Sequence, residues 1–277
     1  MKPIVVGTDF SKCSYVALEL AVDVANKLKT GIRLIWVKKE KLLVSSEHME
    51  IASNLASEKL EQLCQQYSAK LLHGDITWAI REGRVSPTLS DEAREQDASM
   101  IVVGTHGASG FEKHFIGSSA ARVIQEAPCP VLIVRENFNF HKELERIVVP
   151  IRVNTYSRQK AGPASAMARL FGSTVHILGL LDLDEETVTL QGYLRQVEAK
   201  MDSYNVPHNT VMRKYENYSD TVLEYATEIN ADLIVINTEQ DRILSRLFLG
   251  TNAQQIVHQS QIPVLCIHPD DIANFSR

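Results

Sequence analysis

Short apolar runs alternate along the chain with longer segments in which apolar residues recur every three or four positions. In the first half, the runs predict strands over residues 3–7, 31–38, 71–82, 100–104 and 130–134. Such short, nearly continuous Val, Ile and Leu runs are typical of strands buried on both faces. The periodic segments predict helices over residues 15–28, 48–67, 86–96 and 118–126, with Ser14 and Ser86 as N-caps. This alternation predicts an α/β fold, a doubly wound parallel sheet with helices on both faces.

The same order of elements occurs twice. Shifted by 133 residues, positions 98–134 align with 231–267 without a gap, and ten of the 37 positions are identical. Shifted by 143, positions 4–6 align with 147–149. The sequence therefore predicts two tandem doubly wound sandwiches, a domain at 1–140 and a second at 141–277, joined near the polar segment 136–145. Each copy ends in an apolar strand that opens with Pro-Val-Leu. Such an edge strand needs covering, so we expect the halves to pack as a pseudo-dimer with these strands adjacent.

Two glycine motifs follow the apolar run at 100–103. Gly104-Thr105-His106-Gly107 is separated by nine residues from Gly117-Ser118-Ser119, which opens a predicted helix. Glycines leave backbone N–H groups accessible, and a helix N-terminus attracts anions. The spacing fits neither a P-loop nor the dinucleotide fingerprint. The two motifs nevertheless predict a phosphate-binding edge.

The pattern G-x2-G-x9-G-S, followed by an apolar helix and strand, resembles the nucleotide-binding signature of the universal stress protein family. The opening Ile4-Val5-Val6-Gly7-Thr8-Asp9 resembles the first strand of that family and its terminal acid. The resemblance implies an adenine nucleotide alpha hydrolase-like fold, with Asp9 and Val37 holding ribose and adenine and the glycine–serine loop holding the phosphates. The nucleotide-binding residues it indicates are Thr8, Asp9, Val37, Gly104, His106, Gly107, Gly117, Ser118 and Ser119.

The second copy departs from this motif. Under the same shifts, Asp9, Val37, Gly104 and Gly107 become Arg152, Leu180, Asn237 and Gln240, while Gly250-Thr251 is retained. Bulky side chains would obstruct a phosphate, and arginine donates where the acid accepts. We therefore expect one nucleotide per chain, in the N-terminal half. The second half would be a retained scaffold or a site for another anion.

Composition narrows the class of protein. A formal net charge of −5 argues against general nucleic-acid binding. No apolar stretch is long enough to cross a membrane, and the first residues enter a strand without a signal-peptide pattern, so we expect a cytoplasmic protein. The four cysteines are scattered without a C-x-x-C pair, and we predict neither a metal site nor a disulfide framework.

No constellation of catalytic residues is present in the sequence, and His106 is the single candidate base near the glycines. We therefore expect an ATP-binding stress-response regulator, with or without Mg, that hydrolyses ATP slowly at most. It would signal to an unknown protein partner and could form a homodimer. One alternative is a scaffold of the same fold that binds another small molecule or a protein. An enzyme acting on an adenylated substrate rests on fold analogy alone.

Overall fold

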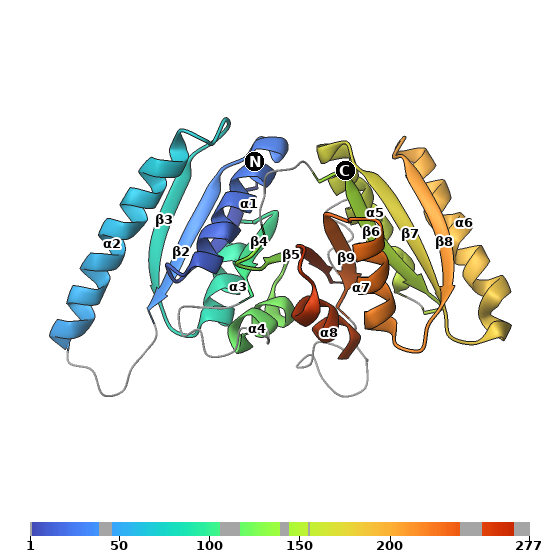
Figure 1. The fold of residues 1–277 in the computed structure, drawn as a ribbon. Helices are drawn as coiled ribbons and strands as arrows, with labels where there is room; N and C mark the ends of the chain where they lie inside the picture. The colour runs from blue at the N-terminus through green and yellow to red at the C-terminus, as the bar shows by residue number, and fades with distance from the viewer. Residues whose placement is uncertain are drawn as a thin grey trace. The chain divides into compact units, whose positions relative to one another are not determined.

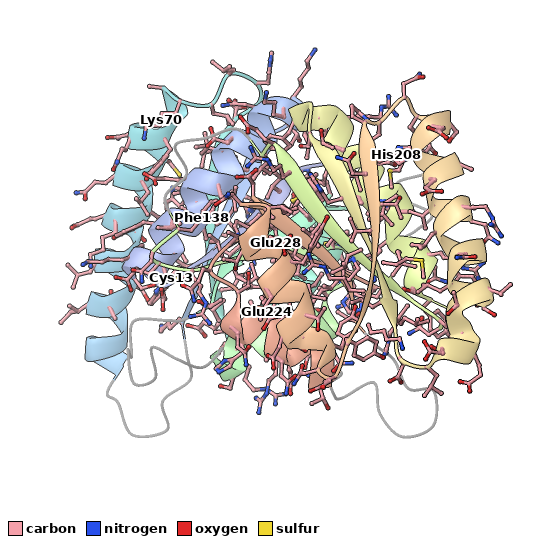
Figure 2. All side chains as sticks on the ribbon, turned by 45° about the vertical axis from the view of Figure 1, so that its right-hand side comes forward. Cys13, Lys70, Phe138, His208, Glu224 and Glu228 are labelled. Carbon is pink, nitrogen blue, oxygen red and sulfur yellow. The ribbon has the colours of Figure 1, made fainter. Side chains whose placement is uncertain are left out.

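The computed structural model describes residues 2–38, 46–105, 117–138, 144–154, 156–238 and 251–268. The chain divides into two compact units, Met1–Asn137 and Phe138–Arg277. Figure 2 labels Phe138, where the second unit begins. The sequence-based division fell between residues 140 and 141.

The first unit alternates strands and helices (Figure 1). Its strands are β1 (Ile4–Thr8), β2 (Ile32–Lys38), β3 (Ile76–Glu82), β4 (Met100–Gly104) and β5 (Val131–Val134). Its helices are α1 (Lys12–Leu28), α2 (Ser46–Ser68), α3 (Val85–Glu95) and α4 (Ser118–Glu126).

The second unit repeats this order and adds two short 3-10 segments. Its strands are β6 (Arg146–Arg152), β7 (Thr174–Leu181), β8 (His208–Lys214), β9 (Leu233–Asn237) and β10 (Val264–Ile267). Its helical segments are η1 (Ser157–Lys160), α5 (Ala161–Phe171), η2 (Asp184–Glu186), α6 (Thr187–Ser203), α7 (Tyr218–Glu228) and α8 (Thr251–Gln259).

Both units have the same strand order. The first runs β3-β2-β1-β4-β5 and the second β8-β7-β6-β9-β10, with parallel pairing within each unit. The central strands are almost wholly buried, because helices cover both faces of each sheet. The predicted tandem α/β architecture is confirmed. The predicted packing of the halves as a pseudo-dimer stays a prediction.

Strand β3 begins later than predicted. Residues 71–75 lead into it through a turn in which Gly74 has φ +71°, a conformation that favours glycine. The N–H groups of Leu71 and Leu72 donate to the carbonyl of Tyr67 and to Oδ1 of Asn26. These bonds complete the end of α2, so the apolar pair at 71–72 belongs to a helix end.

Both predicted N-caps were wrong. Ser11 caps α1 by accepting the N–H of Ser14 at 3.2 Å, and Ser14 lies inside the first turn. Helix α3 begins after Arg84 without a side-chain cap. Ser86 is buried in that helix and donates to Glu126 at 2.7 Å, which ties α3 to α4. Periodicity located the helices but not their first residues. For α1, Ser11 and Ser14 are both suitable N-cap residues, and the pattern does not distinguish between them.

An ionic triad fixes α3 to the sheet in the first unit. Glu92 of α3 is 1% exposed and accepts from Nε of Arg33 on β2 and from Nε of Arg81 on β3, each at 2.8 Å. Both carboxylate oxygens are thus satisfied by cations, which a buried acid requires. The triad joins three elements that are distant in the sequence.

In the described parts of the chain, the helices lack the combination of length and apolar character that crossing a membrane requires.

Candidate functional site

The carboxyl ends of three neighbouring strands carry the predicted residues of the first unit. Thr8 ends β1, Val37 lies next to the end of β2, and Gly104 ends β4. Because β2, β1 and β4 are adjacent and parallel, these residues share one edge of the sheet. The strand order reverses between β1 and β4, since β1 is followed by β2 on one side and β4 on the other. Ligands of open α/β sheets bind outside such a switch point.

Asp9 lies in a tight turn directly after β1. Its Oδ1 accepts the N–H of Ser11 at 3.1 Å, and Oγ1 of Thr8 accepts the N–H of Phe10 at 3.1 Å. The buried hydroxyl of Thr8 also shares a hydrogen bond with Ser14. Thr8 therefore shapes the turn through its side chain, whereas Asp9 is half-buried beside the edge.

Phe10 was missed by sequence reasoning. Its φ of +61° is in the left-handed region, which a residue with a bulky side chain rarely adopts. Its ring stacks on Trp36 of β2 with centroids 6.2 Å apart, and the ammonium group of Lys59 lies 5.2 Å from the ring centre. Backbone strain of this kind persists where the surroundings enforce it, often at functional sites.

Gly104 is required by packing as well as by its place at the edge. A Cβ atom there would lie 2.6 Å from Sγ of Cys13 and 3.1 Å from the Cys13 carbonyl carbon. Cys13 is buried near the start of α1, labelled in Figure 2. Glycine therefore allows the first turn of α1 to lie directly against β4.

Helix α4 opens with the second glycine motif. The N–H of Gly117 donates to the carbonyl of Thr105 at 2.8 Å, which fixes the helix start to the end of β4. In this part of the described chain the helix has no side-chain N-cap and no acid in its first turn. Ser118 is exposed and Ser119 half-buried. An uncapped helix N-terminus with two hydroxyls suits an anion. His106 and Gly107 lie outside the described residues.

Arg135, immediately after β5, is a second residue that the sequence did not single out. Its Nε atom is buried and has no hydrogen-bond partner among the described residues. Burial lowers the pKa of the guanidinium group, and Cys13 counteracts part of that shift. β5 pairs with β4 in register, Val134 opposite Gly104. A cation therefore follows the strand next to the glycine edge.

The same edge of the second unit is chemically different. Thr8 lies opposite Trp36 and Ile151 opposite Gly179, the same register under the 143-residue shift, so Leu180 occupies the position of Val37. Their partners on the next strand, Arg81 and Arg213, correspond as well. Arg152 ends β6 and Asn237 ends β9, where the first unit has an acid and a glycine. Gln240 and Gly250 lie outside the described residues.

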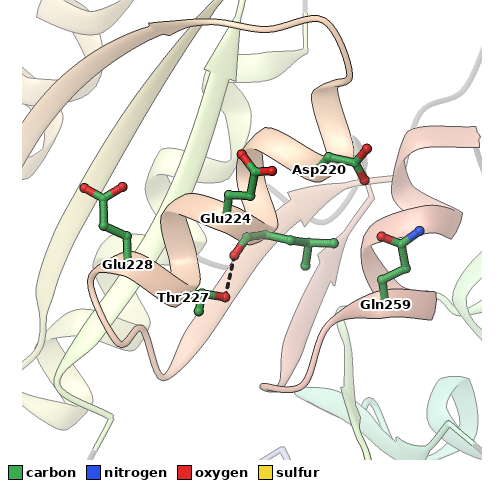
Figure 3. A pocket seen from close by; sticks show the side chains of 6 residues that line it. Asp220, Glu224, Thr227, Glu228 and Gln259 are labelled. Carbon is green, nitrogen blue, oxygen red and sulfur yellow. Dashed lines mark hydrogen bonds between the residues drawn. The ribbon is translucent and has the colours of Figure 1, made fainter.

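A separate groove of about 520 Å³ lies between α7 and α8 in the second unit (Figure 3). Figure 2 labels Glu224 and Glu228 on α7. The groove is lined by Asp220, Leu223, Glu224, Thr227, Glu228 and Gln259. Glu228 pairs with Arg213 at 2.7 Å, and Thr227 donates to the carbonyl of Leu223. This groove is distinct from the strand edge that carries the glycine motifs. Within the described ranges, no three His, Cys, Asp or Glu residues form a metal-binding group.

Comparison with known proteins gives matches to both halves. The model of the universal stress protein family matches residues 1–135 and again 143–268. A universal stress protein of Methanocaldococcus jannaschii is 31% identical over 141 residues, which cover 49% of this chain and 82% of the relative. One from Mycobacterium bovis is 23% identical over 289 residues, covering 95% of this chain and 99% of the relative.

The solved structures include a similar fold along nearly the whole chain. The crystal structure of a universal stress protein from Archaeoglobus fulgidus superposes with a TM-score of 0.81 at 20% identity. It covers 96% of this chain and 98% of that one. At this identity the similarity concerns the fold.

Proposed function

The chain belongs to the universal stress protein family, and from that premise we propose that its N-terminal domain binds one adenine nucleotide as a regulatory ligand. The observation that carries the proposal is the convergence of Asp9, Val37 and Gly104 on one strand edge beside the uncapped N-terminus of α4. Ligand-binding crevices of this fold class occur at such an edge.

Each part of a nucleotide has a matching group in this proposal. The carboxylate of Asp9 accepts hydrogen bonds from ribose hydroxyls, and the half-buried Val37 provides an apolar wall for adenine. The backbone N–H groups at the start of α4 and the hydroxyls of Ser118 and Ser119 donate to phosphate oxygens. His106 and Gly107 complete the phosphate loop by their sequence positions. Mg²⁺, if it accompanies ATP, would be held mainly by the phosphates.

The proposed role is binding rather than rapid turnover. His106 is the candidate base by its sequence position alone, and in the described part of this edge Oδ1 of Asp9 already accepts the Ser11 N–H. An efficient general base needs to contact the attacking water. The protein would therefore act through its nucleotide-bound state, in the cytoplasm, on a partner whose identity the site does not specify.

Calorimetric titration of the intact chain with ATP tests the proposal, with an expected stoichiometry near one. Gly117→Val should abolish binding, because the side chain would fill the anion position and press on the Thr105 carbonyl oxygen, which lies 3.2 Å from where the new Cβ would stand. Gly250→Val, the aligned change in the second domain, is the matched control and should leave binding intact. A stoichiometry near two, or no binding by a chain freed of bound nucleotide, contradicts the proposal.

Asp9→Asn provides a finer test. Asparagine keeps an Oδ1 that can accept the Ser11 N–H, so the turn is preserved while the charge is lost. A hydrogen bond to a charged group is stronger than a neutral one by about 1 kcal/mol. We expect ATP affinity to fall roughly fivefold. Unchanged affinity would remove Asp9 from the site.

A further inference from the structure

The carboxyl edge of the second sheet contains two cations where the first has an acid and a small residue. Arg152 aligns with Asp9, and Lys160 aligns with Ala17 of α1. Lys160 is only 3% exposed and lies at the end of η1. In the described parts of the chain, none of the carboxylates forms an ion pair with it. A buried lysine in this position destabilises the domain unless an anion accompanies it.

The surroundings of Lys160 disfavour its charged form. Burial lowers the pKa of its ammonium group to about 7, and the cation Arg152 adds to the shift. Burial and the charges of Asp182 and Glu186 raise the pKa of the neighbouring Tyr215, while Arg152 lowers it. The guanidinium group of Arg152 is held over the ring of Tyr218, 5.2 Å from its centre.

Two amide oxygens point to a ligand that can also donate. Asn237 at the end of β9 is 9% exposed, and its Nδ2 donates to the carbonyl of Tyr156 at 3.2 Å. This bond fixes the orientation of the amide, whose Oδ1 is buried without a hydrogen-bond partner among the described residues. Oε1 of Gln159, which precedes Lys160 in the chain, is also buried without a hydrogen-bond partner among the described residues. Buried acceptors are normally paired, so each is a position where a hydroxyl group could bind.

The backbone brings these residues to one place. The N–H of Arg152 donates to Oγ of Ser157, and Asn237 binds the residue that precedes η1. Segment η1 therefore lies across the ends of β6 and β9, the two strands between which the strand order reverses in this unit. The cluster thus occupies the switch point of the second sheet.

We propose that this cluster, Arg152, Lys160, Asn237 and Gln159, is a second binding site, for a small phosphorylated compound that carries a hydroxyl group. The two cations match the two negative charges of a phosphate monoester, and the amide oxygens accept from the hydroxyl. The site is independent of the nucleotide proposed for the N-terminal domain.

Titration of the full chain with glycerol 3-phosphate tests the proposal. We expect the second-domain affinity to fall at least tenfold in Lys160→Met and in Arg152→Gln. Lys200→Met, which removes one exposed lysine charge from the same domain, should bind as the unaltered chain does. Phosphate binding by the N-terminal loop would be common to all these proteins, so the difference between variants isolates the second domain. Identical isotherms for the unaltered chain, Lys160→Met and Arg152→Gln, or no binding by the unaltered chain, overturn the proposal.

Methyl phosphate, which has no hydroxyl group, separates the contribution of the amides. We expect it to bind about threefold to tenfold more weakly than glycerol 3-phosphate, the value of one neutral hydrogen bond. In Asn237→Leu that preference should shrink. Equal binding of the two compounds by the unaltered chain overturns the hydroxyl assignment. ATP titrations of the same variants should be unchanged, which distinguishes failure here from failure of the N-terminal nucleotide site.

Discussion

The two domains use one strand order but differ where their helices first meet the sheet. In the first, α1 begins at Lys12 and Cys13 packs on Gly104. In the second, the aligned strand end is Asn237, whose amide binds the carbonyl of Tyr156, and a 3-10 segment precedes α5. A larger residue at the strand end thus accompanies a 3-10 segment ahead of the α-helix. The edge of a duplicated sheet can therefore exchange an acid and a glycine for an arginine and an asparagine while the fold persists.

A second difference concerns how α3 and its counterpart α7 are held. Arg33, Glu92 and Arg81 form the ionic triad of the first domain. The aligned residues of the second are His176, Tyr225 and Arg213. The guanidinium group of Arg213 lies 4.8 Å from the Tyr225 ring centre, and the Tyr225 hydroxyl is 3.5 Å from Nδ1 of His176. One position in the fold is therefore stabilised by buried charge in one copy and by an aromatic ring in the other.

The substitution with the largest expected effect on stability removes the acid of the ionic triad. Glu92→Gln would leave Arg33 and Arg81 without their shared counter-ion, and we expect the free energy of unfolding of the first domain to fall by about 3 kcal/mol. Arg81 is 39% exposed, which keeps the loss at the lower end of the usual range. Tyr225→Phe is the matched change in the second domain, and its loss should stay below about 1 kcal/mol. Urea denaturation checks both, and equal losses would contradict the contrast.

Lys160→Met should raise the free energy of unfolding of the second domain, whereas Glu92→Gln lowers that of the first. The folded-state pKa of Lys160, about 7, is below its ordinary value of 10.5. Protonation of Lys160 therefore favours the unfolded state. Above pH 10.5 the buried lysine is neutral in both states and does not reduce the stability of the second domain, whereas stability is lost progressively as the pH falls from 10.5 toward 7. We expect the variant to be more stable at pH 7 by a few kcal/mol and the gain to shrink toward pH 10. Chemical denaturation without added phosphate measures it, and a destabilised variant at pH 7 would contradict the unfavourable burial of this charge.

Gly104→Ala sharpens the comparison at the strand ends. The new methyl group would overlap Sγ of Cys13, and we expect a loss of about 1–3 kcal/mol. In a Cys13→Gly background the same change should cost less, because the overlapping side chain is gone. A double-mutant cycle measures this coupling. Strict additivity of the two changes would show that another contact limits residue 104.

The smallest effect is the pH response of His176. Burial and the charge of Arg146 lower its pKa below 6.5. Its neutral form is thus favoured in the folded state, so the second domain should lose less than about 1 kcal/mol as the pH falls below 6.5. Tyr225 is the neighbouring titratable group and stays protonated in this range. His176→Gln should flatten the profile between pH 6.5 and 5, whereas an unchanged slope would assign it to other groups.

The sequence predicted the architecture well because short apolar strands and periodic helices are local patterns. The strand at Met100–Gly104 and the helix at Ser118–Glu126 were predicted with the observed bounds. The late start of β3 was not foreseen, because Leu71 and Leu72 have the apolar character of strand residues. Their N–H groups instead donate to the Tyr67 carbonyl and to Oδ1 of Asn26. Apolar character alone does not distinguish a buried strand from a helix end.

The position of Thr8, Val37 and Gly104 at one strand edge could also be predicted, because the carboxyl ends of parallel strands meet. The left-handed conformation of Phe10 and the contact between Cys13 and Gly104 could not, since both depend on packing between separate elements. The interpretation of Gly104 as a phosphate-facing residue overlooked the thiol behind it. The buried Lys160 was missed because it lies in a helical pattern with Ser157 and Gln159, where a lysine ordinarily faces water.

The ionic triad also restricts the order in which mutations can accumulate in the first domain. Replacing Glu92 first leaves Arg33 and Arg81 without their shared counter-ion, whereas replacing Arg33 first leaves Glu92 paired with Arg81. An evolutionary path from this arrangement to the His–Tyr–Arg arrangement of the second domain therefore passes more easily through an arginine than through the glutamate. In a lineage of related genes, changes at Glu92 should be accompanied by changes at Arg33.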